Sequence, residues 1–469
     1  MGSVLMNSQV EESLRSDLAT DLFQFMDAAD IPYAIVGDTR DYRHTILSDI
    51  DIVVAHDHLR SSIDALVSFA KSKELGIVQV LQHEQSAWYF VLAKTDTQGG
   101  IHFIQPDICS DYYRFGRLFI RASDILDGRV INSYDRMRFC KPGPAMAFLY
   151  YLMKKIDKGV LTDRQGDYLS AEWQKDPSGA RCQLTMLWRD DAAKLLAHAA
   201  VRNDWSAVRM ALPALRKQLH RGLPFSFKHW LNDIIRKMRR ILNPTGLHVV
   251  FLGPDGCGKS TVLAQVEKSL GPVFRRTKTY HLRPYFGKAQ NDCTPNLNPH
   301  NNTVRDIPSS LAKLALWWAD FTIGYFADVF PRLVKSTLVL FDRYYHDLAI
   351  DPRRYRYGGS IALARLLHSL IPRPDLFILL DAPPEVIQTR KNEVSYEETE
   401  KQLDRYRAFI ASVNNGHTID ASLPIHLVVE QVNQIILSTL AERVSTRLRI
   451  AKHFPCRASR TNPAIKPGQ

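Results

Sequence analysis

Residues 247–265 read LHVVFLGPDGCGKSTVLAQ, and this stretch decides the fold of the C-terminal half. A short run of apolar and β-branched residues leads into a glycine-rich loop, and a helix-forming pattern follows the loop. Glycines allow backbone N–H groups to point at phosphate oxygens, and the N-terminus of the following helix adds positive charge. The order of strand, loop and helix is that of a P-loop, which predicts a site for a nucleoside triphosphate.

The loop positions have separate expected roles. Lys259 would reach the β- and γ-phosphates, and Ser260 would ligate Mg²⁺. The other residues expected to hold the nucleotide are Gly253, Asp255, Gly256, Gly258 and Thr261. The predicted cofactors are therefore ATP and Mg²⁺.

Length and composition set the broad class. The chain has 469 residues and a formal net charge of +12. This length indicates about two or three domains, and the charge favours anionic partners such as nucleotides and phosphorylated sugars. Six scattered cysteines without a CxxC pair argue against a zinc knuckle or a disulfide framework and favour a reducing cytoplasm. We expect a cytoplasmic protein that binds a nucleoside triphosphate and a small anionic acceptor, without a nucleic acid partner.

No segment reads as a membrane span. The N-terminus carries early acidic residues and no apolar core, which is not the pattern of a secretory signal. Residues 311–334 are rich in aromatic side chains, but Lys313, Asp320, Asp328 and Arg332 interrupt them. This stretch predicts a buried or partner-facing helix and leaves only peripheral contact with a membrane open.

The N-terminal region places carboxylates at strand spacing. Asp49 and Asp51 alternate with isoleucines in SDIDIVV, residues 48–54, so the two carboxylates face one side of the predicted strand. Two carboxylates at this spacing repel each other unless a cation lies between them, which predicts a Mg²⁺ site. Asp107, near the end of a strand predicted over 100–108, would be the third ligand. The alternative is a pair of exposed strand aspartates.

These residues resemble the nucleotidyltransferase superfamily that includes DNA polymerase beta. Its pattern is a strand ending in Gly-Gly or Gly-Ser, then an acidic-x-acidic strand, then a later carboxylate. The resemblance implies an α+β domain over residues 1–141, with metal ligands at Asp49, Asp51 and Asp107. Here the first element reads Gly37-Asp38, and an aspartate at that position would oppose a triphosphate electrostatically.

A helical region is predicted over residues 142–245. Apolar residues recur at spacings of three and four, and no cluster of histidines or carboxylates stands out. Residues 225–242, FSFKHWLNDIIRKMRRIL, predict an amphipathic basic helix that ends at Asn243-Pro244. Its basic residues belong to a solvated linker face or, alternatively, meet acidic lipid or nucleic acid.

The C-terminal half alternates buried strands with helices. Residues 337–341 predict a strand that delivers Asp342 and Arg343 at its carboxyl end, and residues 375–381 predict another that leads into a helix. The fold class is therefore α/β, with a parallel sheet covered by helices on both faces. A polar loop over 287–305 is expected to cover a substrate.

Three motifs resemble the thymidylate kinase family of P-loop nucleoside monophosphate kinases: GPDGCGKS, FDRYYHD and LLDAPPEVIQTRKNEVSYEE. The resemblance implies a kinase domain over 246–448, followed by a basic tail, 449–469, that is expected to be disordered. It implies that Lys259, Asp342, Arg343 and Arg390 are catalytic, Arg390 and Lys391 lying in a basic lid. It implies Asp342 as a second metal residue beside Ser260, and acceptor contacts from Asp255, Arg283, Tyr344 and Lys391.

The match breaks down at the acceptor site. The family's Thr-Arg-Glu-Pro-Gly motif is absent, and only Leu282-Arg283-Pro284 lies at comparable spacing. Arg353, Arg354 and Arg356 also form a cationic cluster that is not expected of a housekeeping thymidylate kinase. These departures favour a different acidic acceptor, such as a sugar or glycan intermediate. In this respect the chain resembles the thymidylate-kinase-like proteins that accompany bacterial surface-polysaccharide assembly.

The sequence is compatible with three functions. The first is an ATP-dependent kinase that phosphorylates a nucleoside monophosphate or a sugar or glycan intermediate. The second is a nucleotidyltransferase that acts through the N-terminal aspartates, with the P-loop half as nucleotide sensor. The third is a pair of nucleotide-binding scaffolds without catalysis. Structural alternatives also stand: Asp342 and Arg343 as a plain ion pair, and Arg390 with Lys391 as a solvated helix face.

Overall fold

The computed structural model describes residues 2–46, 48–96, 99–284, 303–391 and 395–448. The chain divides into two units. Unit 1 holds the described residues of Met1–Asp96, Ile101–Arg239 and Ala441–Gln469, and unit 2 those of Thr97–Gly100 and Arg240–Leu440. The predicted N-terminal and helical regions thus both fall largely in unit 1. The predicted basic tail, and most of the polar loop expected to cover a substrate, lie outside the described residues.

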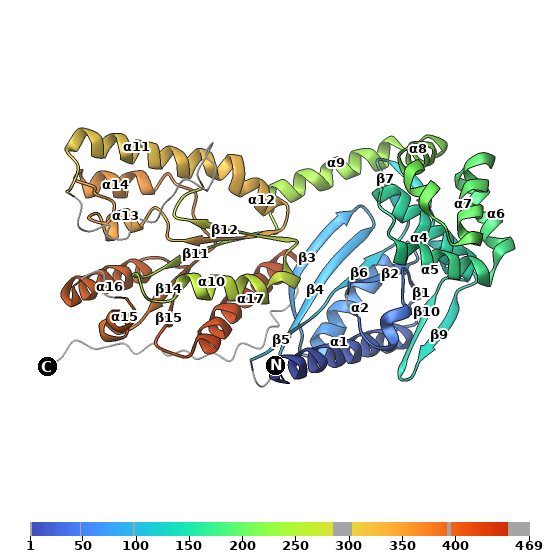
Figure 1. The fold of residues 1–469 in the computed structure, drawn as a ribbon, viewed down its shortest axis with the longest axis horizontal. Helices are drawn as coiled ribbons and strands as arrows, with labels where there is room; N and C mark the ends of the chain where they lie inside the picture. The colour runs from blue at the N-terminus through green and yellow to red at the C-terminus, as the bar shows by residue number, and fades with distance from the viewer. Residues whose placement is uncertain (1, 47, 97–98, 285–302, 392–394, 449–469) are drawn as a thin grey trace. The chain divides into compact units, whose positions relative to one another are not determined.

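A mixed sheet forms the centre of unit 1 (Figure 1). Its strands are β1 (Tyr33–Ile35), β2 (Ile50–Val54), β3 (Gly76–Glu84), β4 (Ala87–Thr95), β5 (Ile101–Ile104) and β6 (Pro106–Cys109), in the order β1-β2-β6-β4-β3 with β5 also on β4. Only the β2–β6 pair is parallel. The strand predicted over 100–108 divides into β5 and β6 at Gln105, next to Pro106, whose nitrogen carries no hydrogen for the ladder.

Both faces of this sheet are covered. Side chains alternate between the two faces along each strand, and apolar residues of the strands pack on both. Tyr33, Ile35, Ile50, Ile52 and Val54 pack in one core with α1 (Gly2–Ala28) and α2 (Leu59–Ser72). The alternate residues Ala34, Val36 and Val53 pack in a second core with the helical region. Asp51 therefore faces the helical region, because it alternates with Ile50 and Ile52.

The helical region of the sequence forms six helices within the described residues. They are α4 (Pro144–Lys158), α5 (Asp163–Lys175), α6 (Pro177–Leu187), α7 (Asp190–Arg202), α8 (Ser206–Gly222) and α9 (Phe227–Leu242). Proline at the first position starts α4, and Gly159 in the left-handed conformation ends it. The remaining elements of unit 1 are η1 (Arg40–Arg43), α3 (Ala122–Leu126) and two hairpins, β7 (Tyr112–Arg114) with β8 (Arg117–Ile120) and β9 (Val130–Tyr134) with β10 (Met137–Lys141).

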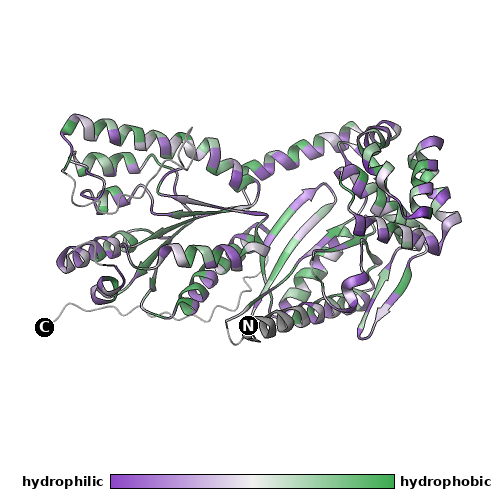
Figure 2. Ribbon diagram, in the orientation of Figure 1, coloured by the Kyte–Doolittle hydropathy of each residue, from purple (hydrophilic) through white to green (hydrophobic). Residues whose placement is uncertain are grey.

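Unit 2 has the predicted parallel sheet. Its strands are β11 (Leu247–Leu252), β12 (Arg276–His281), β13 (Thr337–Asp342), β14 (Leu376–Asp381) and β15 (Gly416–Asp420), in the order β12-β13-β11-β14-β15. Every neighbouring pair is parallel. The three central strands, β11, β13 and β14, are largely apolar (Figure 2), as expected of strands buried on both faces, whereas the edge strands β12 and β15 carry mostly polar residues. β11 lies at the centre, so the loop that follows it opens at the middle of the sheet's carboxyl edge.

Helices cover both faces of this sheet (Figure 1). One face packs against α11 (Ile307–Gly324), α13 (Asp347–Ile350), α14 (Ile361–His368) and α16 (Tyr396–Ala411). In Figure 1, α10 (Lys259–Ser269) and α17 (Ile425–Leu448) lie on the other side of the strands from α11, and the end of α17 from Ala441 onward belongs to unit 1. The other elements are η2 (Gly271–Val273), the π-helix η5 (Tyr325–Val329), α12 (Phe330–Val334) and α15 (Pro384–Arg390).

The aromatic stretch 311–334 forms α11, η5 and α12, with Leu314, Trp317 and Phe321 buried and Leu316 and Phe326 exposed. Within the described residues, no helix combines the length and the apolar character needed to cross a bilayer. The four cysteines that the structure describes, Cys109, Cys140, Cys182 and Cys257, are free thiols.

Candidate active site

The loop after β11 has the backbone that a phosphate cradle needs. Gly253, Gly256 and Gly258 have φ angles of +137°, +89° and +92°, which L-residues with side chains rarely adopt. A Cβ on Gly253 would lie 2.7 Å from the carbonyl oxygen of Leu380. The glycine at this position is therefore required both by conformation and by the close approach of β14.

Lys259 lies inside the curve of the loop. Its Nζ donates hydrogen bonds to the carbonyl oxygens of Gly253 and Pro254, both at 2.8 Å, and the residue is only 6% exposed. Ser260 and Thr261 follow in the first turn of α10 and are exposed. Lys259 thus lies within the loop, and Ser260 and Thr261 lie at the N-terminus of the helix that follows it, so their roles toward phosphate and Mg²⁺ stay a prediction.

Asp342 ends β13 beside His281, which ends β12 in register with it. His281 Nδ1 lies 3.4 Å from Asp342 Oδ2, and Asp342 Oδ1 is buried without a hydrogen-bond partner among the described residues. Burial alone would raise the pKa of this carboxyl. The hydrogen bond from His281 and the charges of Lys259 and Arg343 outweigh burial and hold the pKa below its usual range. An ionised carboxylate with one unpartnered oxygen fits Mg²⁺ or a metal-bound water.

Arg343 joins the P-loop to the end of β13. Its guanidinium forms ion pairs with Asp255 of the loop and, at 2.7 Å, with the buried Asp347 of α13. Arg354 also pairs with Asp255. Burial would raise the pKa of Asp255, but Arg343, Lys259 and Arg354 lower it far below its usual range. Asp255 is therefore ionised at neutral pH.

The same arginine has an unusual backbone. Arg343 has φ +72°, the left-handed region, and its N–H donates to the Phe251 carbonyl oxygen at 2.9 Å. Asp347, its partner, also accepts hydrogen bonds from the hydroxyls of Tyr355 at 3.1 Å and Tyr406 at 3.0 Å. A non-glycine residue in this region costs of order 1 kcal/mol or more and persists where the surrounding contacts fix it.

A second group of cations surrounds Trp317 on α11. Arg283 lies over the indole ring at 5.4 Å from its centre and pairs with Asp320 at 2.7 Å, while the Lys313 ammonium lies 5.2 Å from the same ring. Burial first, and then the charges of Arg305, Arg283 and Arg356, lower the pKa of Lys313 to about 8. Four cations close enough to affect one another form a site that favours an anion.

Lys313 and Arg305 were not predicted as site residues. In the sequence Lys313 precedes Trp317 by one helical turn, so the two side chains share a helix face. From the sequence alone, Lys313 was named only as one of the charged residues that interrupt an aromatic helix. Arg305 and Arg356 are brought together by the backbone hydrogen bond from the Arg305 N–H to the Arg356 carbonyl oxygen at 3.2 Å. This contact joins residues 51 positions apart in the chain, so no local pattern signals it.

Three other predicted site residues are Tyr344, Arg390 and Lys391, and their surroundings differ. Tyr344 is 1% exposed, and its hydroxyl donates to the Pro372 carbonyl oxygen at 3.0 Å, so its side chain belongs to the core. We therefore leave Tyr344 out of the acceptor site. Arg390, exposed at the end of α15, donates to the Ala421 carbonyl oxygen at 3.0 Å. A Cβ on Gly256 would lie 3.0 Å from Lys391 Cβ, which places Lys391 against the P-loop.

Comparison with known proteins finds similarity over part of the chain. No protein-family model matches the chain. Among curated proteins, the thymidylate kinase of Xanthomonas euvesicatoria pv. vesicatoria is 27% identical over 220 residues, which are 44% of this chain and 89% of that protein. The thymidylate kinase of Prochlorococcus marinus is 28% identical over 209 residues, 42% of this chain and 98% of that protein. About 44% of the chain is homologous to thymidylate kinases.

Solved structures of thymidylate kinases were also matched. The enzyme from Ehrlichia chaffeensis aligns with a TM-score of 0.31 and 18% identity, over 41% of this chain and 100% of its own. The enzyme from Candida albicans aligns with a TM-score of 0.33 and 18% identity, over 42% of this chain and 94% of its own.

The predicted N-terminal metal ligands lie at the starts of two neighbouring interior strands of the unit 1 sheet, β2 and β6. Asp51 and Asp107 are partners in the parallel register of β2 and β6, and Asp49 is exposed just before β2. Lys154 of α4 pairs with Asp51 at 2.9 Å. Burial first, then Asp51 and Asp49, raise the pKa of Asp107, while Lys154 lowers it. Within the described residues, no group of three or more His, Cys, Asp or Glu side chains has metal-binding geometry.

The glycine before these carboxylates is also close to them. Gly37 has φ +107°, and a Cβ there would lie 4.0 Å from Asp51 Oδ2. Asp38, the residue that departs from the nucleotidyltransferase pattern, pairs with Arg40 at 2.7 Å. Burial would raise the pKa of Asp38, but the hydrogen bonds and charge of Arg40 lower it. The negative charge expected to oppose a triphosphate is thus partly compensated.

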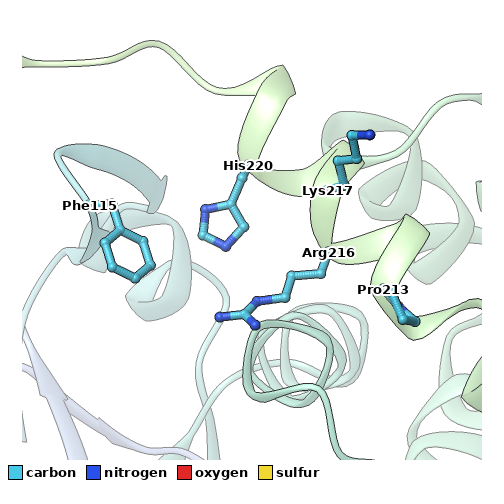
Figure 3. A pocket seen from close by; sticks show the side chains of 5 residues that line it. All are labelled: Phe115, Pro213, Arg216, Lys217 and His220. Atoms are coloured by element: carbon cyan, nitrogen blue, oxygen red, sulfur yellow. The ribbon is translucent and has the colours of Figure 1, made fainter.

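Unit 1 also carries an open pocket of about 310 Å³ at the end of α8 (Figure 3). It is lined by Phe115, Pro213, Arg216, Lys217 and His220, none of which was predicted as a site residue. His220 hydrogen-bonds to Asp157 at 2.9 Å, and Arg216 lies 3.9 Å from the same carboxylate. Asp157 thus already partners Arg216 and His220.

We predict that Gly253→Ala destabilises unit 2, because the new methyl group meets backbone at 2.7 Å and the φ angle disfavours it. The expected loss is about 1–3 kcal/mol, read as a lower midpoint in thermal unfolding followed by circular dichroism. Gly271→Ala is the matched control, because a Cβ there meets nothing within 4 Å. Equal midpoints for the two variants would contradict the assigned loop geometry.

Proposed function

We propose that unit 2 is an ATP-dependent phosphotransferase that moves the γ-phosphoryl group of ATP to a small anionic acceptor. Homology to thymidylate kinases supports an ATP-dependent nucleotide kinase. The observation that carries the proposal is the ionised Asp342, with one unpartnered buried oxygen, at the strand next to the P-loop and Lys259. Phosphoryl transfer needs positioning and charge compensation from the protein and little covalent chemistry, which this site offers.

The roles of the chain's own residues follow from their positions. Backbone amides of the P-loop hold the donor phosphates, and Lys259 leaves the loop carbonyls for the phosphate oxygens. Mg²⁺, which Ser260 and Asp342 would hold, neutralises charge on the β- and γ-phosphates when it is bound. Arg343 lies at the same strand end as Asp342, and Arg390 approaches from the end of α15. Together these cations compensate charge on the moving phosphoryl group.

The two cations beside Trp317 and two arginines whose charges act on Lys313 are the proposed acceptor site. Arg283, Arg305, Lys313 and Arg356 form it, next to Arg354 on Asp255 of the P-loop. Compared with the predicted acceptor residues, this site keeps Arg283, adds Arg305, Lys313 and Arg356, and leaves out Tyr344. The other two predicted acceptor residues, Asp255 and Lys391, lie in and against the P-loop. A phosphate-bearing acceptor, whether thymidylate, another nucleoside monophosphate, or a sugar or glycan intermediate, supplies the missing negative charge. A cytoplasmic location accords with the free thiols of the described cysteines.

A second candidate function lies in unit 1. The register that sets Asp51 beside Asp107, with Gly37 close to Asp51, favours a nucleotidyltransferase that passes a nucleoside monophosphate to an acceptor. Asp107 Oδ1 is buried without a hydrogen-bond partner among the described residues. Burial first, and then the charges of Asp51 and Asp49, raise the pKa of this carboxyl, and a bound cation would offset both effects. Lys154 provides part of that compensation through Asp51.

For the kinase, we expect transfer of label from γ-labelled ATP in a screen of nucleoside monophosphates and phosphorylated sugars. Lys259→Ala and Asp342→Ala should each lower the rate at least about 100-fold, because each removes charge compensation that the transition state needs. Lys401→Ala, an exposed change on α16, is the control and should keep the wild-type rate. Full turnover in both active-site variants would refute the assignment.

The acceptor site predicts a pH dependence. With the pKa of Lys313 at about 8 in the ligand-free protein, its charge is present below that pH and lost above it. The KM for the acceptor should therefore rise between pH 7 and pH 9, while Lys313→Arg, which stays charged throughout, should show a flatter profile. Steady-state kinetics at fixed saturating ATP measure this. Identical profiles for the two proteins would place the acceptor elsewhere.

For the second candidate, we expect release of pyrophosphate from a nucleoside triphosphate that survives Lys259→Ala. The release should vanish in the double variant Asp49→Asn with Asp51→Asn, because the proposed metal loses two anionic ligands. A coupled pyrophosphate assay with the full chain measures it. Absence of release with every common triphosphate and acceptor would remove this candidate.

A further inference from the structure

Unit 2 contains a large cavity that none of the residues assigned above lines. Its volume is about 1090 Å³, at the upper end of typical ligand pockets. The residues that line it come from α13, α14 and α16, helices labelled in Figure 1, and from the segments that lead into β14 and β15. Ile350, Ala364, Phe377 and Phe409 give it an apolar wall. Its size and wall suit an organic molecule larger than a simple ion.

A buried polar group divides this cavity from the active site. His346 lines the cavity, whereas the carboxylate of the next residue, Asp347, pairs with Arg343 at 2.7 Å. Asp347 is 0% exposed, and Tyr355 and Tyr406 donate hydrogen bonds to it. A ligand in the cavity therefore need not displace a nucleotide from the P-loop.

The cavity lining is positively charged. Arg365, Arg373 and Arg405 belong to it, and no carboxylate is present among the described residues that line it. Arg405 donates to the Ile350 carbonyl oxygen at 3.1 Å and lies 3.6 Å from Glu398. Arg365 and Arg373 form no hydrogen bond or ion pair with any residue in the part of the chain that the structure describes. Cations at the mouth of an apolar cavity attract an anionic group.

Two histidines add polar atoms to the apolar wall. The Nε2 atoms of His346 and His368 are in direct hydrogen-bond contact. His346 is 7% exposed, and its ring centre lies 4.5 Å from that of Phe409 and 5.0 Å from that of Phe377. Its Nδ1 is buried without a partner among the described residues. An unpartnered polar atom at such a buried side chain is costly unless a ligand or water satisfies it.

We propose that this cavity binds an amphipathic organic anion, whose acidic group pairs with Arg365 and Arg373 and whose apolar body lies against Phe377 and Phe409. Phosphate and carboxylate head groups share the chemistry that two arginines recognise. The apolar wall supplies the remaining affinity through burial of hydrocarbon or aromatic surface. The inference does not depend on the phosphoryl acceptor of the proposed kinase.

The probe is 8-anilinonaphthalene-1-sulfonate, an aromatic anion whose fluorescence rises in apolar surroundings. We expect saturable binding at one site per full-length chain. Arg365→Gln with Arg373→Gln should weaken binding at least about tenfold, and both arginines are exposed, so the fold is retained. Arg275→Gln with Arg276→Gln removes the same charge from exposed positions of unit 2 and should leave binding unchanged. Equal affinities for the two double variants would overturn the proposal.

Competition against the probe tests whether the ligand needs both its acidic group and its apolar body. Dodecanoate and dodecyl phosphate, below their micellar concentrations, should displace the probe, and their relative affinities report which head group the cavity takes. Dodecanol, which lacks the charge, and inorganic phosphate, which lacks the apolar body, should not displace it. Displacement by either of these, or by MgATP, would overturn the proposal.

Discussion

One guanidinium group, that of Arg343, fixes the candidate active site. It is 3% exposed and lies between Asp255 of the P-loop and Asp347 of α13. A buried charge is tolerated only when it is paired, so the arginine, the loop and the helix must keep their relative positions. The two tyrosines that donate to Asp347 complete the hydrogen bonds of the network. The left-handed backbone of Arg343 is held by these contacts.

The parallel sheet explains why these groups meet. β11 lies at its centre, with β13 on one side and β14 on the other, so the P-loop, Asp342 and the loop before α15 all emerge at the same carboxyl edge. His281 reaches Asp342 because β12 is the next strand. Residues that are far apart along the chain thus become neighbours through strand order alone. The charges of neighbouring side chains then lower the pKa of Asp255 and of Asp342, so that both carboxyls stay ionised.

Local sequence patterns predicted most of the strands and loops of unit 2 that form the candidate site, but few of the contacts between its side chains. The glycine loop, the strand ending in Asp342 and the parallel sheet follow from spacing and apolar runs, because these signals lie within a few residues of each other. Tyr344 was assigned by motif, but its side chain turns into the core. Arg354, predicted only as part of a cationic cluster, pairs with Asp255. Lys313 and Arg305 depend on how loops pack on α11, which no local pattern encodes. In unit 1 the carboxylate spacing was read from the sequence, but the Lys154 ammonium beside Asp51 was not.

The central claim is that the loop after β11 holds a nucleoside triphosphate with Mg²⁺. Isothermal titration calorimetry of the full chain tests it most directly, at two temperatures so that a zero enthalpy at one of them is not mistaken for no binding. The account predicts one ATP per chain, with a dissociation constant between about 1 μM and 1 mM, as is usual for enzyme substrates. It also predicts markedly weaker binding when Mg²⁺ is removed. No heat at either temperature, with ATP or with any other common triphosphate, would contradict it.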